Sequence, residues 1–347
     1  MCGIAGTVGQ RDSRLLRAMA RIMAHRGPDD EGFYEEGPVG LAARRLKIID
    51  LVGGHQPLAN EDESCWLVFN GEIYNFLELR ERLEKKGHRF RSRTDGETIL
   101  HLYEEEGDGC LRHLEGMFAF ALWDRPRRRL LLARDQLGIK PLYYRLDGGR
   151  LHFASELKAL LLDPACPRDV DLEALALYLT FLYIPSPATI FRGILKLPPG
   201  HVLVFENGRA AVRPYWDLAF PGARLEDRRE ATAEVRAALE DSVRRHLVSD
   251  VPLGVFLSSG MDSSTVVALM RRATGGPIKT FTLDFEESSF SEAAAARVVA
   301  RAFGTEHREF IVRPEIADLL PRLVWHLDEP LGDSSLIVTA LVSELAR

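Results

Sequence analysis

The chain has 347 residues, of which 46% are hydrophobic and 28% charged, and its formal net charge is -6. This length accommodates two domains with separate cores. The longest apolar runs fall short of a membrane span, and the basic residues are scattered rather than massed in one tract, so we expect neither a membrane nor a nucleic-acid partner. The four cysteines show no pairing scheme and no metal-ligand spacing, which fits a reducing cytoplasm.

Residues 1–208 alternate predicted strands and helices without the strict rhythm of a parallel sheet, which favours a layered α+β domain. The apolar run at 66–73 predicts a strand that ends in a tight turn at Asn70–Gly71. Asn75 is expected to cap a helix that Gly87 ends. Further strands are predicted at 116–124, 130–134, 151–156 and 201–208.

Residues 209–229 combine Pro, Gly and dense charge without a period, and we interpret them as a linker. Residues 230–347 then form the second predicted domain. It opens on a helix with the apolar stripe Val235, Leu239, Val243 and Leu247. Strand, helix, strand, helix and strand are expected to follow over 251–257, 264–276, 278–285, 291–304 (capped by Ser291) and 308–312. This order is typical of a doubly wound parallel sheet.

The first six residues, MCGIAG, place a cysteine directly after the initiator methionine. The segment is too short and too weakly apolar for a signal peptide. Removal of Met1 is expected because the side chain of Cys2 is small. The thiol then lies beside its own α-amino group, whose pKa is ordinarily about 7.7–8.0, and this amine can act as the general base. A thiol without a catalytic role is the alternative.

A thiolate that attacks a carboxamide also needs an oxyanion site and groups that hold the charged end of its substrate. Asn70 and Gly71 are candidates for the oxyanion hole. Arg45 suits a carboxylate, and Glu72 and Asp95 suit an ammonium group. A side-chain amide, a carboxylate and an ammonium group together describe glutamine. Taken singly, the same residues are typical of a turn, a solvated surface and a helix cap.

Six colinear motifs support the functional interpretation: MCGIAG, HRGPDD (25–30), NGEIYN (70–75), RTDGET (93–98), EGMFAFALWD (115–124) and ARDQLGIKPLYY (133–144). This set resembles the class II glutaminase domain of the asparagine synthetase family, an N-terminal-nucleophile hydrolase with an αββα fold. The resemblance implies Cys2 as the nucleophile and Asn70 and Gly71 as the oxyanion hole. It also implies that Arg45, Asn70, Gly71, Glu72 and Asp95 bind glutamine.

A second motif, GVFLSSGMDSSTVVALM at 254–270, reads as a buried strand, a serine-glycine turn and a helix. Backbone N–H groups in such a turn cradle phosphate oxygens, aided by the positive helix N-terminus. An ordinary polar turn with a serine cap is the alternative. The motif lacks the lysine of a Walker loop and resembles the SGGxDS loop of the ATP pyrophosphatases. Ser259 stands where that family has a glycine, and a serine resists a positive φ.

This second resemblance implies an α/β ATP-pyrophosphatase domain (PP-loop, adenine nucleotide α-hydrolase-like). The residues that it implies for ATP binding are Leu257, Ser258, Ser259, Gly260, Asp262, Ser263 and Leu283, and Ser264 adds a further hydroxyl. Asp262 is the candidate ligand for Mg²⁺ bound to the phosphates. The segment DEPLGDSS at 328–335 matches a family segment near the nucleotide and aspartate sites, which makes Asp328, Glu329 and Asp333 candidates. A helix-capping loop is the alternative there.

The combined resemblance implies a glutamine-dependent asparagine synthetase: aspartate and ATP form β-aspartyl-AMP, and ammonia released at Cys2 attacks it. Family members continue past Arg347 into a further strand and an acidic, glycine-rich loop, so we expect an incomplete ATP-pyrophosphatase domain that makes little asparagine. The alternatives are amidation of another carboxylate, glutaminase activity alone, or a non-catalytic binding role. A phosphoribosyltransferase as the second domain is disfavoured by SSGMDSS. A homodimer is expected by analogy.

Overall fold

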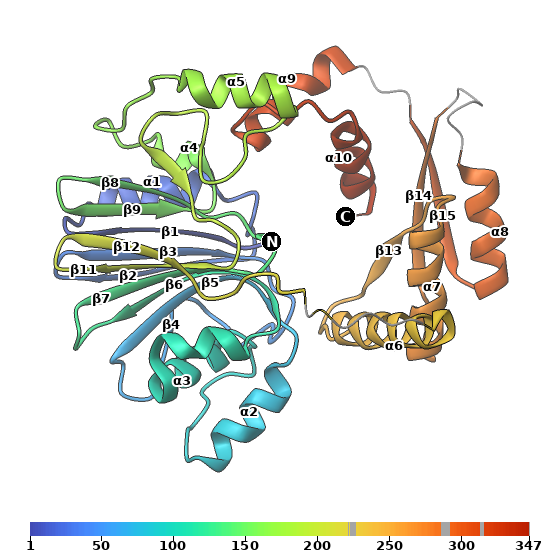
Figure 1. Ribbon diagram of the computed structural model, residues 1–347, viewed down its shortest axis with the longest axis horizontal. Helices are drawn as coiled ribbons and strands as arrows, with labels where there is room; N and C mark the ends of the chain where they lie inside the picture. Colours follow the sequence, from blue (N-terminus) through green and yellow to red (C-terminus); the bar gives the residue numbers. More distant parts are fainter. Residues whose placement is uncertain (221, 223–226, 286–291, 313–315, 347) are drawn as a thin grey trace. The chain divides into compact units, whose positions relative to one another are not determined.

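The computed structural model describes residues 1–347 apart from 221, 223–226, 286–291, 313–315 and 347 (Figure 1). The chain divides into two compact units. The first comprises Met1–Ala219 together with Asp328–Leu331, and the second comprises Phe220–Leu327 and Gly332–Arg347.

The first unit is built on two six-stranded sheets whose strands pair in antiparallel fashion. The first sheet has the order β10 (Ile194–Lys196), β8 (Tyr143–Asp147), β9 (Arg150–Ala154), β1 (Gly3–Val8), β3 (Val39–Arg45) and β2 (Asp30–Glu36). The second sheet has the order β12 (Arg209–Pro214), β11 (His201–Glu206), β7 (Arg129–Arg134), β6 (Gly116–Asp124), β5 (Cys65–Ile73) and β4 (Leu58–Ala59).

Helices cover both outer faces of this sandwich, as Figure 1 shows. The helices of the first unit are α1 (Ser13–Ile22), α2 (Phe76–Lys85), α3 (Glu97–Glu106), a 3₁₀ turn (Gly107–His113), α4 (Leu157–Leu160) and α5 (Leu172–Phe181). α1 and α4 pack on the first sheet, and α2 and α3 pack beside the second. The layers are therefore helix, sheet, sheet and helix, which confirms the predicted αββα fold.

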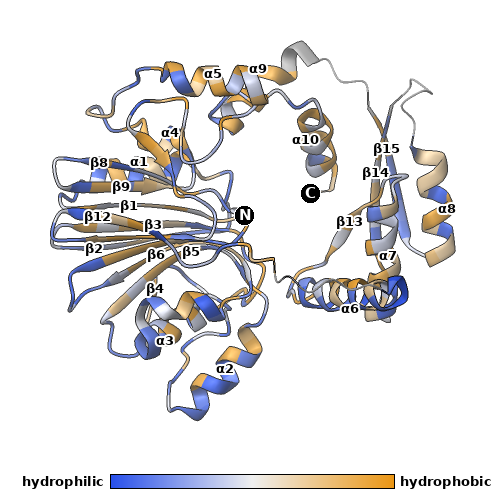
Figure 2. Cartoon of the chain, viewed as in Figure 1, coloured by the Kyte–Doolittle hydropathy of each residue, from blue (hydrophilic) through white to orange (hydrophobic). Residues whose placement is uncertain are grey.

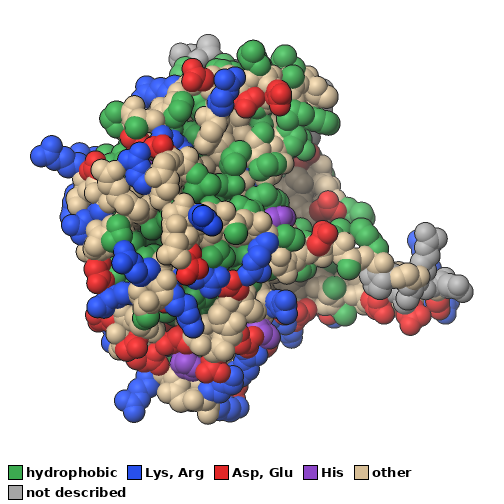
Figure 3. Space-filling view, turned by 60° about the vertical axis from the view of Figure 1, so that its left-hand side comes forward, with side chains coloured by type: hydrophobic (Ala, Val, Ile, Leu, Met, Phe, Trp, Pro, Cys, Tyr) green, Lys and Arg blue, Asp and Glu red, His purple; other side chains and the backbone are tan. Residues whose placement is uncertain are grey.

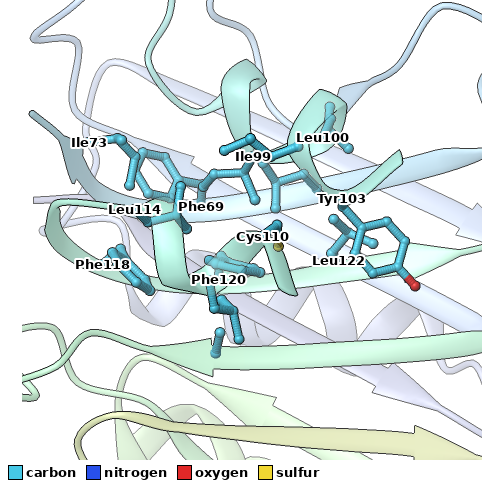
Figure 4. Close-up of a cluster of buried hydrophobic side chains, with 14 of the residues drawn as sticks. Phe69, Ile73, Ile99, Leu100, Tyr103, Cys110, Leu114, Phe118, Phe120 and Leu122 are labelled. Atoms are coloured by element: carbon cyan, nitrogen blue, oxygen red, sulfur yellow. The ribbon is translucent and has the colours of Figure 1, made fainter. Parts of the chain in front are cut away.

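Strand β6 shows why the first unit needs uninterrupted apolar runs. Phe118, Phe120 and Leu122 face the cluster under α2 and α3, which Figure 4 shows in close-up. Ala119 and Ala121 alternate with them and face the core between the two sheets. Because successive side chains of a strand point to opposite faces and both faces are buried here, the whole segment must be apolar.

The structure differs from the sequence prediction at Asn70–Gly71, which does not form a turn. Strand β5 continues through both residues, and its pairing with β6 runs on to Ile73 opposite Gly116. A Cβ atom at Gly71 would lie 2.2 Å from the carbonyl oxygen of Met117. Glycine is therefore required here for the close approach of two strands rather than for a positive φ.

The predicted linker was wrong over its first part. Arg209–Pro214 forms β12, which pairs with β11 along its whole length. Asn207 and Gly208 join the two strands with φ values of 52° and 74°. Two positive φ values are those of a type I′ hairpin turn, for which Asn-Gly is the favoured pair, so this sequence signal was present but not recognised.

Two predicted helix caps have different outcomes. Asn75 precedes α2, but its side chain donates to the carbonyl of His113 and accepts from the N–H of Glu115, so it joins the helix start to the approach to β6. The cap predicted at Ser291 lies outside the described residues. The helix that follows ends as predicted, at Gly304 with a φ of 60°.

The second unit contains a three-stranded parallel sheet in the order β13 (Gly254–Phe256), β14 (Lys279–Phe285) and β15 (Glu306–Val312). Its helices are α6 (Arg228–His246), α7 (Met261–Ala273), α8 (Ala293–Phe303), α9 (Ile316–Leu327) and α10 (Ser335–Ala346). The predicted alternation of strand and helix in a parallel sheet is confirmed. The described strands follow chain order, so this part of the sheet shows no reversal of winding.

The predicted stripe on α6 is only partly buried: Val243 is 9% exposed, whereas Val235 is 60% exposed. Helix α10 is coloured mostly as hydrophobic in Figure 2. None of the described helices combines the length and the apolar character that crossing a membrane requires. On the face shown in Figure 3, basic and acidic side chains are interspersed and form no large patch of one sign.

Candidate active sites

Cys2 lies directly before β1, where Gly3 pairs with Arg44 of β3. Its Sγ lies 3.8 Å from the carbonyl oxygen of Leu46, and its own carbonyl accepts a hydrogen bond of 3.0 Å from Arg26 Nε. Burial raises the pKa of the thiol, and the hydrogen bond to Leu46 opposes this only in part. The thiol is therefore held in place but remains protonated near neutral pH unless a base removes its proton.

Asn70 is fully buried in β5, with an exposed fraction of 0%. Among the described residues, neither its side-chain oxygen nor its side-chain nitrogen has a hydrogen-bond partner. An unpaired buried polar group costs about 1–3 kcal/mol of stability, and native structures contain few of them. Such an amide is expected where a ligand supplies the missing partner.

The backbone of Gly71 presents an N–H group on the same stretch of β5. Gly71 lies opposite Phe118 in the strand register. The N–H of Phe118 donates to the Asp135 carboxylate at 3.2 Å, and the carbonyl of Phe118 accepts the N–H of Asp135 at 2.8 Å. Antiparallel pairs alternate between bonded and non-bonded, so Gly71 belongs to a non-bonded pair and its N–H points away from β6. Two residues on, the N–H of Ile73 points the same way and bonds to Asp95.

Arg45 ends β3 and is 4% exposed. Its Nη2 donates to the carbonyl oxygens of Ile49 and Asp50 at 2.9 Å and 2.7 Å. Its Nη1 has no hydrogen-bond partner within the part of the chain that the structure describes. A Cβ atom at Gly54 would lie 2.2 Å from Nη2, so the neighbouring loop closes tightly on the guanidinium. The group is therefore fixed on one side and available on the other.

Glu72 and Asp95 form a pair of buried carboxyl groups. The Oδ2 atom of Asp95 accepts the N–H of Ile73 at 2.7 Å, and its Oδ1 accepts the hydroxyl of Thr94 at 3.1 Å. Burial raises the pKa of Asp95, and burial together with the charge of Asp95 raises the pKa of Glu72, which Lys140 opposes. A cationic group placed between them would relieve this repulsion.

The charges of these groups affect one another, as expected of a single site. Arg45 and Glu72 both act on the pKa of Cys2, and Arg45 and Asp95 both act on that of Glu72. Asn70 and Gly71 precede Glu72 directly in β5. The structure thus brings together the residues that the sequence predicts for a glutaminase site.

Three further residues of this site received no role in the sequence analysis, although the motifs that contain them were recognised. Arg26 holds the carbonyl of Cys2, as described above. Asp135 is 1% exposed and accepts N–H groups of Leu137, Ile139 and Lys140 at 2.9–3.1 Å. It thereby shapes the loop that brings the Lys140 ammonium to Glu72 and Cys2.

Behind Cys2, a chain of ion pairs is centred on Glu156, which is 5% exposed. Its carboxylate lies 2.9 Å from His25 Nε2 and 3.0 Å from Arg26 Nη1. Lys158 Nζ pairs with it at 2.7 Å and with Asp328 at 2.9 Å. The hydrogen bond from Arg26 connects this network to the residue that carries the thiol.

The candidates in DEPLGDSS separate in the structure. Asp328 and Glu329 belong to the first unit, although the residues before and after the segment 328–331 belong to the second. Glu329 pairs with Lys196 at 2.7 Å and accepts the N–H of Ile190 at 3.0 Å. Asp333, two residues before α10, accepts the N–H of Ser335, the first residue of that helix, at 2.9 Å. The helix-capping alternative therefore holds for Asp333.

In the second unit, the serine-rich loop joins β13 to α7. The N–H of Ser258 donates to Ser263 Oγ at 3.1 Å, and the N–H of Gly260 donates to Ser258 Oγ at 3.1 Å. Ser259 does not adopt a positive φ, so its side chain creates no strain of the kind expected from the sequence. Its N–H donates to a carboxylate oxygen of Glu292 at 3.1 Å, so it is oriented to bind an anionic oxygen.

The other residues predicted to bind ATP lie around this loop. Leu257 is buried, and its carbonyl accepts the hydroxyl of Thr282 at 2.6 Å, next to Leu283 near the C-terminal end of β14. Asp262 is exposed in the first turn of α7. Loop, helix N-terminus and strand end thus lie at the carboxyl edge of a parallel sheet, where such sheets bind ligands.

Comparisons with known proteins agree in both units. Residues 1–216 match the family described as glutamine amidotransferase domain, and residues 234–347 match that described as asparagine synthase. The chain is 38% identical over 356 residues to "Asparagine synthetase [glutamine-hydrolyzing] 1" of Bacillus subtilis (strain 168), covering 100% of this chain and 56% of that protein. It is 34% identical over 374 residues to "Putative asparagine synthetase [glutamine-hydrolyzing] 2" of Methanocaldococcus jannaschii, covering 100% and 72%.

The chain therefore spans only part of the length of these relatives. Among solved structures, "structure of the allosteric regulatory enzyme of purine biosynthesis" matches with a TM-score of 0.50 and 16% identity, covering 91% of this chain and 81% of that one. At this identity the likeness shows a common fold and nothing about the reaction.

Proposed function

Because this chain belongs to the family of glutamine-hydrolysing asparagine synthetases, we propose that its first unit hydrolyses glutamine at Cys2 and that its second unit takes part in amidating aspartate with the ammonia released. The observation that carries the first half is a pair of buried groups, the Asn70 amide and Arg45 Nη1, for which the described residues supply no hydrogen-bond partner. Arg45 and Glu72 both act on the pKa of the Cys2 thiol, and Asn70 lies two residues before Glu72 in β5. Glutamine offers groups that could pair with both.

In this proposal, Met1 is removed and the new α-amino group takes the proton of the Cys2 thiol. The sulfur attacks the carboxamide carbon of glutamine, and the negative oxygen that forms is held by the Asn70 amide and the Gly71 N–H. The proton passes to the leaving nitrogen, which departs as ammonia. Water then hydrolyses the γ-glutamyl thioester to give glutamate and regenerate the thiol.

The base is required because burial raises the pKa of the Cys2 thiol. An amine on the same residue, with a pKa ordinarily about 8, is able to take the proton. While Met1 is attached, the nitrogen of Cys2 is part of an amide and cannot act as the base. The site therefore becomes active only after Met1 is removed.

The remaining groups position the substrate. Arg45 Nη1 pairs with the α-carboxylate of glutamine, and the ammonium group lies between Glu72 and Asp95. The arrangement fits an α-amino acid in which cation and anion are held by opposite charges, leaving the carboxamide at the sulfur.

For the second unit, we propose that the loop at 257–263 binds ATP, with the backbone N–H groups and serine hydroxyls on the phosphates and Leu283 near the adenine. The aspartate side chain attacks the α-phosphorus, releases pyrophosphate and forms β-aspartyl-AMP, from which ammonia displaces AMP. One carboxylate, that of Asp262, together with phosphate oxygens is a ligand set that suits Mg²⁺. The ion would neutralise charge on the phosphates.

The glutaminase proposal is tested by glutamate release. Cys2→Ala should abolish it, and Asn70→Asp should lower kcat by about 10²–10³, as loss of one oxyanion donor does. Asn207→Asp, in the exposed turn between β11 and β12, is the matched control and should keep the wild-type rate. Unchanged glutamate release by Cys2→Ala would refute the proposal.

The acceptor is tested separately, by pyrophosphate release from ATP in the presence of aspartate or of other carboxylic acids. Aspartate-dependent release would support asparagine formation. Release with another carboxylate but not with aspartate would favour amidation of that acceptor instead, the alternative that the sequence left open.

A further inference from the structure

Four side chains from three separate segments of the first unit converge away from the glutaminase site. They come from the loop between β4 and β5, the loop after α2, and α3, which lie close together in Figure 1. We refer to them as the His–Glu cluster: Glu61, His88, His101 and Glu104. One ligand atom from each residue lies within 4.8 Å of the ligand atoms of all the others.

Four nitrogen–oxygen distances within the cluster, between 2.8 Å and 3.7 Å, are close to those of a small coordination shell. The Nδ1 atom of His101 lies 2.8 Å from Glu104 Oε2 and 3.4 Å from Glu61 Oε2. The Nδ1 atom of His88 lies 3.6 Å from Glu104 Oε2 and 3.7 Å from Glu61 Oε1. In a tetrahedral zinc site with bonds near 2.0–2.1 Å, adjacent ligand atoms are about 3.3 Å apart. Small rotations of the side chains therefore suffice to enclose an ion.

Each imidazole ring presents Nδ1 to the cluster and Nε2 toward a carboxylate outside it. His88 Nε2 lies 3.1 Å from Glu105 Oε1, within hydrogen-bond distance. His101 Nε2 lies 3.6 Å from Glu97 Oε1 and has no hydrogen-bond partner among the described residues. At His88, a carboxylate at the far nitrogen keeps the proton there and leaves the Nδ1 lone pair for a metal, as is typical of metal-bound histidine.

The two ligand carboxylates are oriented in the same manner. The Oε1 atom of Glu61 accepts the N–H of Arg89 at 2.8 Å. The Oε1 atom of Glu104 accepts Asn60 Nδ2 at 2.7 Å. In each case the second oxygen, Oε2, remains for the cluster. His101 is fully buried whereas Glu104 is exposed, so the ion has both a rigid base and a path of entry.

The charge of this region favours a cation. Four carboxylates, those of Glu61, Glu97, Glu104 and Glu105, surround two imidazoles, and the cations that pair with them include Lys86, at Glu105. A proton on His101, shared with Glu104 at 2.8 Å, is the competing solution. A divalent metal ion would neutralise more charge than one proton and would use all four ligand atoms.

We propose that the His–Glu cluster is a structural site for a divalent transition metal of the zinc class, with two nitrogen and two oxygen ligands. Four protein ligands close the shell, which is the form of a structural rather than a catalytic site. The ion would join the β4–β5 loop to α3 and to the segment after α2. That segment leads through Ser92 to Asp95, so the metal would hold the loop that carries one of the carboxyl groups proposed to bind glutamine.

The test measures metal binding by the whole chain after treatment with a chelator. The N-terminal thiol and amine are themselves metal ligands, so the measurements use Cys2→Ala as the background. We expect one Co²⁺ per chain with the visible absorption of tetrahedral coordination, displaced by Zn²⁺, and a higher Tm with Zn²⁺ than without. His88→Gln in this background should weaken binding by at least about 100-fold, since it removes a ligand from the half-buried edge.

His113→Gln is the matched control, because His113 pairs with Glu106 close by but lies outside the cluster. It should bind Co²⁺ like the background. If His88→Gln does not fold, as judged by circular dichroism, Glu61→Gln replaces it. Absence of stoichiometric Co²⁺ binding, or binding that neither variant weakens, would overturn the proposal and leave a proton on His101 as the cation of the cluster.

Discussion

The replacement Glu156→Gln tests whether the ion-pair network behind Cys2 stabilises the first unit. Burial alone would raise the pKa of Glu156, but the hydrogen bonds from His25 and Lys158 and the charges of Lys158 and Arg26 lower it to about 2, from an ordinary value of 4.5. This difference corresponds to about 3 kcal/mol of stabilisation at neutral pH. The side chain is 6% exposed, so solvent screens these pairs little.

The sign of the pH dependence follows from the lowered pKa. The unfolded chain binds a proton on Glu156 below about pH 4.5, whereas the folded chain remains ionised down to about pH 2. The stabilisation is therefore complete above pH 4.5 and is lost progressively as the pH falls toward 2. Glu156→Gln should cost about 3 kcal/mol near pH 7 and clearly less near pH 3.

Hydrogen exchange measures this effect within one unit of a two-unit chain, where global unfolding need not be two-state. The slowest amides of β1 and β9 should exchange about two orders of magnitude faster in Glu156→Gln than in wild type near pH 7, and about one order faster near pH 3. Glu81→Gln, which removes an exposed pair with Lys85, should leave these rates unchanged. Equal rates in Glu156→Gln and wild type, or a ratio that does not fall with pH, would refute the reasoning.

Three further predictions concern the proposed glutaminase site. Arg45→Lys should raise the KM for glutamine by about 10–100-fold with little change in kcat, because an ammonium group cannot both hold two backbone carbonyls and pair with a carboxylate. An unchanged KM would exclude Arg45 as the group that binds the α-carboxylate of glutamine. Gly71→Ala should lower Tm by several degrees in a thermal melt, because its Cβ would clash with the backbone of β6. Glutamine should bind Cys2→Ala more weakly near pH 6 than near pH 8, since the raised pKa values of Glu72 and Asp95 make protonation compete with the ammonium group. Calorimetry in buffers of different ionisation enthalpy should then show proton release on binding, and pH-independent affinity would contradict the assignment.

Local patterns predicted those parts of the fold that neighbours in the chain determine. The apolar run of β6 indicated a strand buried on both faces, and Gly304 marked the end of α8, because side-chain alternation and backbone conformation are properties of adjacent residues. The Asn207–Gly208 hairpin belongs to the same class, and it was missed because Pro, Gly and dense charge over 209–229 suggested a linker.

Contacts between distant segments were not predictable in this way. Asn-Gly at Asn70–Gly71 is locally a turn signal, yet the long pairing of β5 with β6 extends the strand through it. The same dipeptide makes a turn after β11, whose pairing with β7 ends at Glu206, directly before Asn207. Tertiary pairing therefore decided between two structures that the local sequence permits equally.

The sequence by itself determined which reactive groups the protein carries: a cysteine beside the chain terminus, an amide, a guanidinium and two carboxylates in motifs spread from Cys2 to Asp95. Only the tertiary structure decided which of these groups find no hydrogen-bond partner among the described residues. It also decided that Glu156 and the His–Glu cluster bring together residues far apart in the chain. The physical reason is that burial and charge pairing depend on distance in space. Chain order constrains that distance only over a few residues, and the packing of sheets and helices sets the rest.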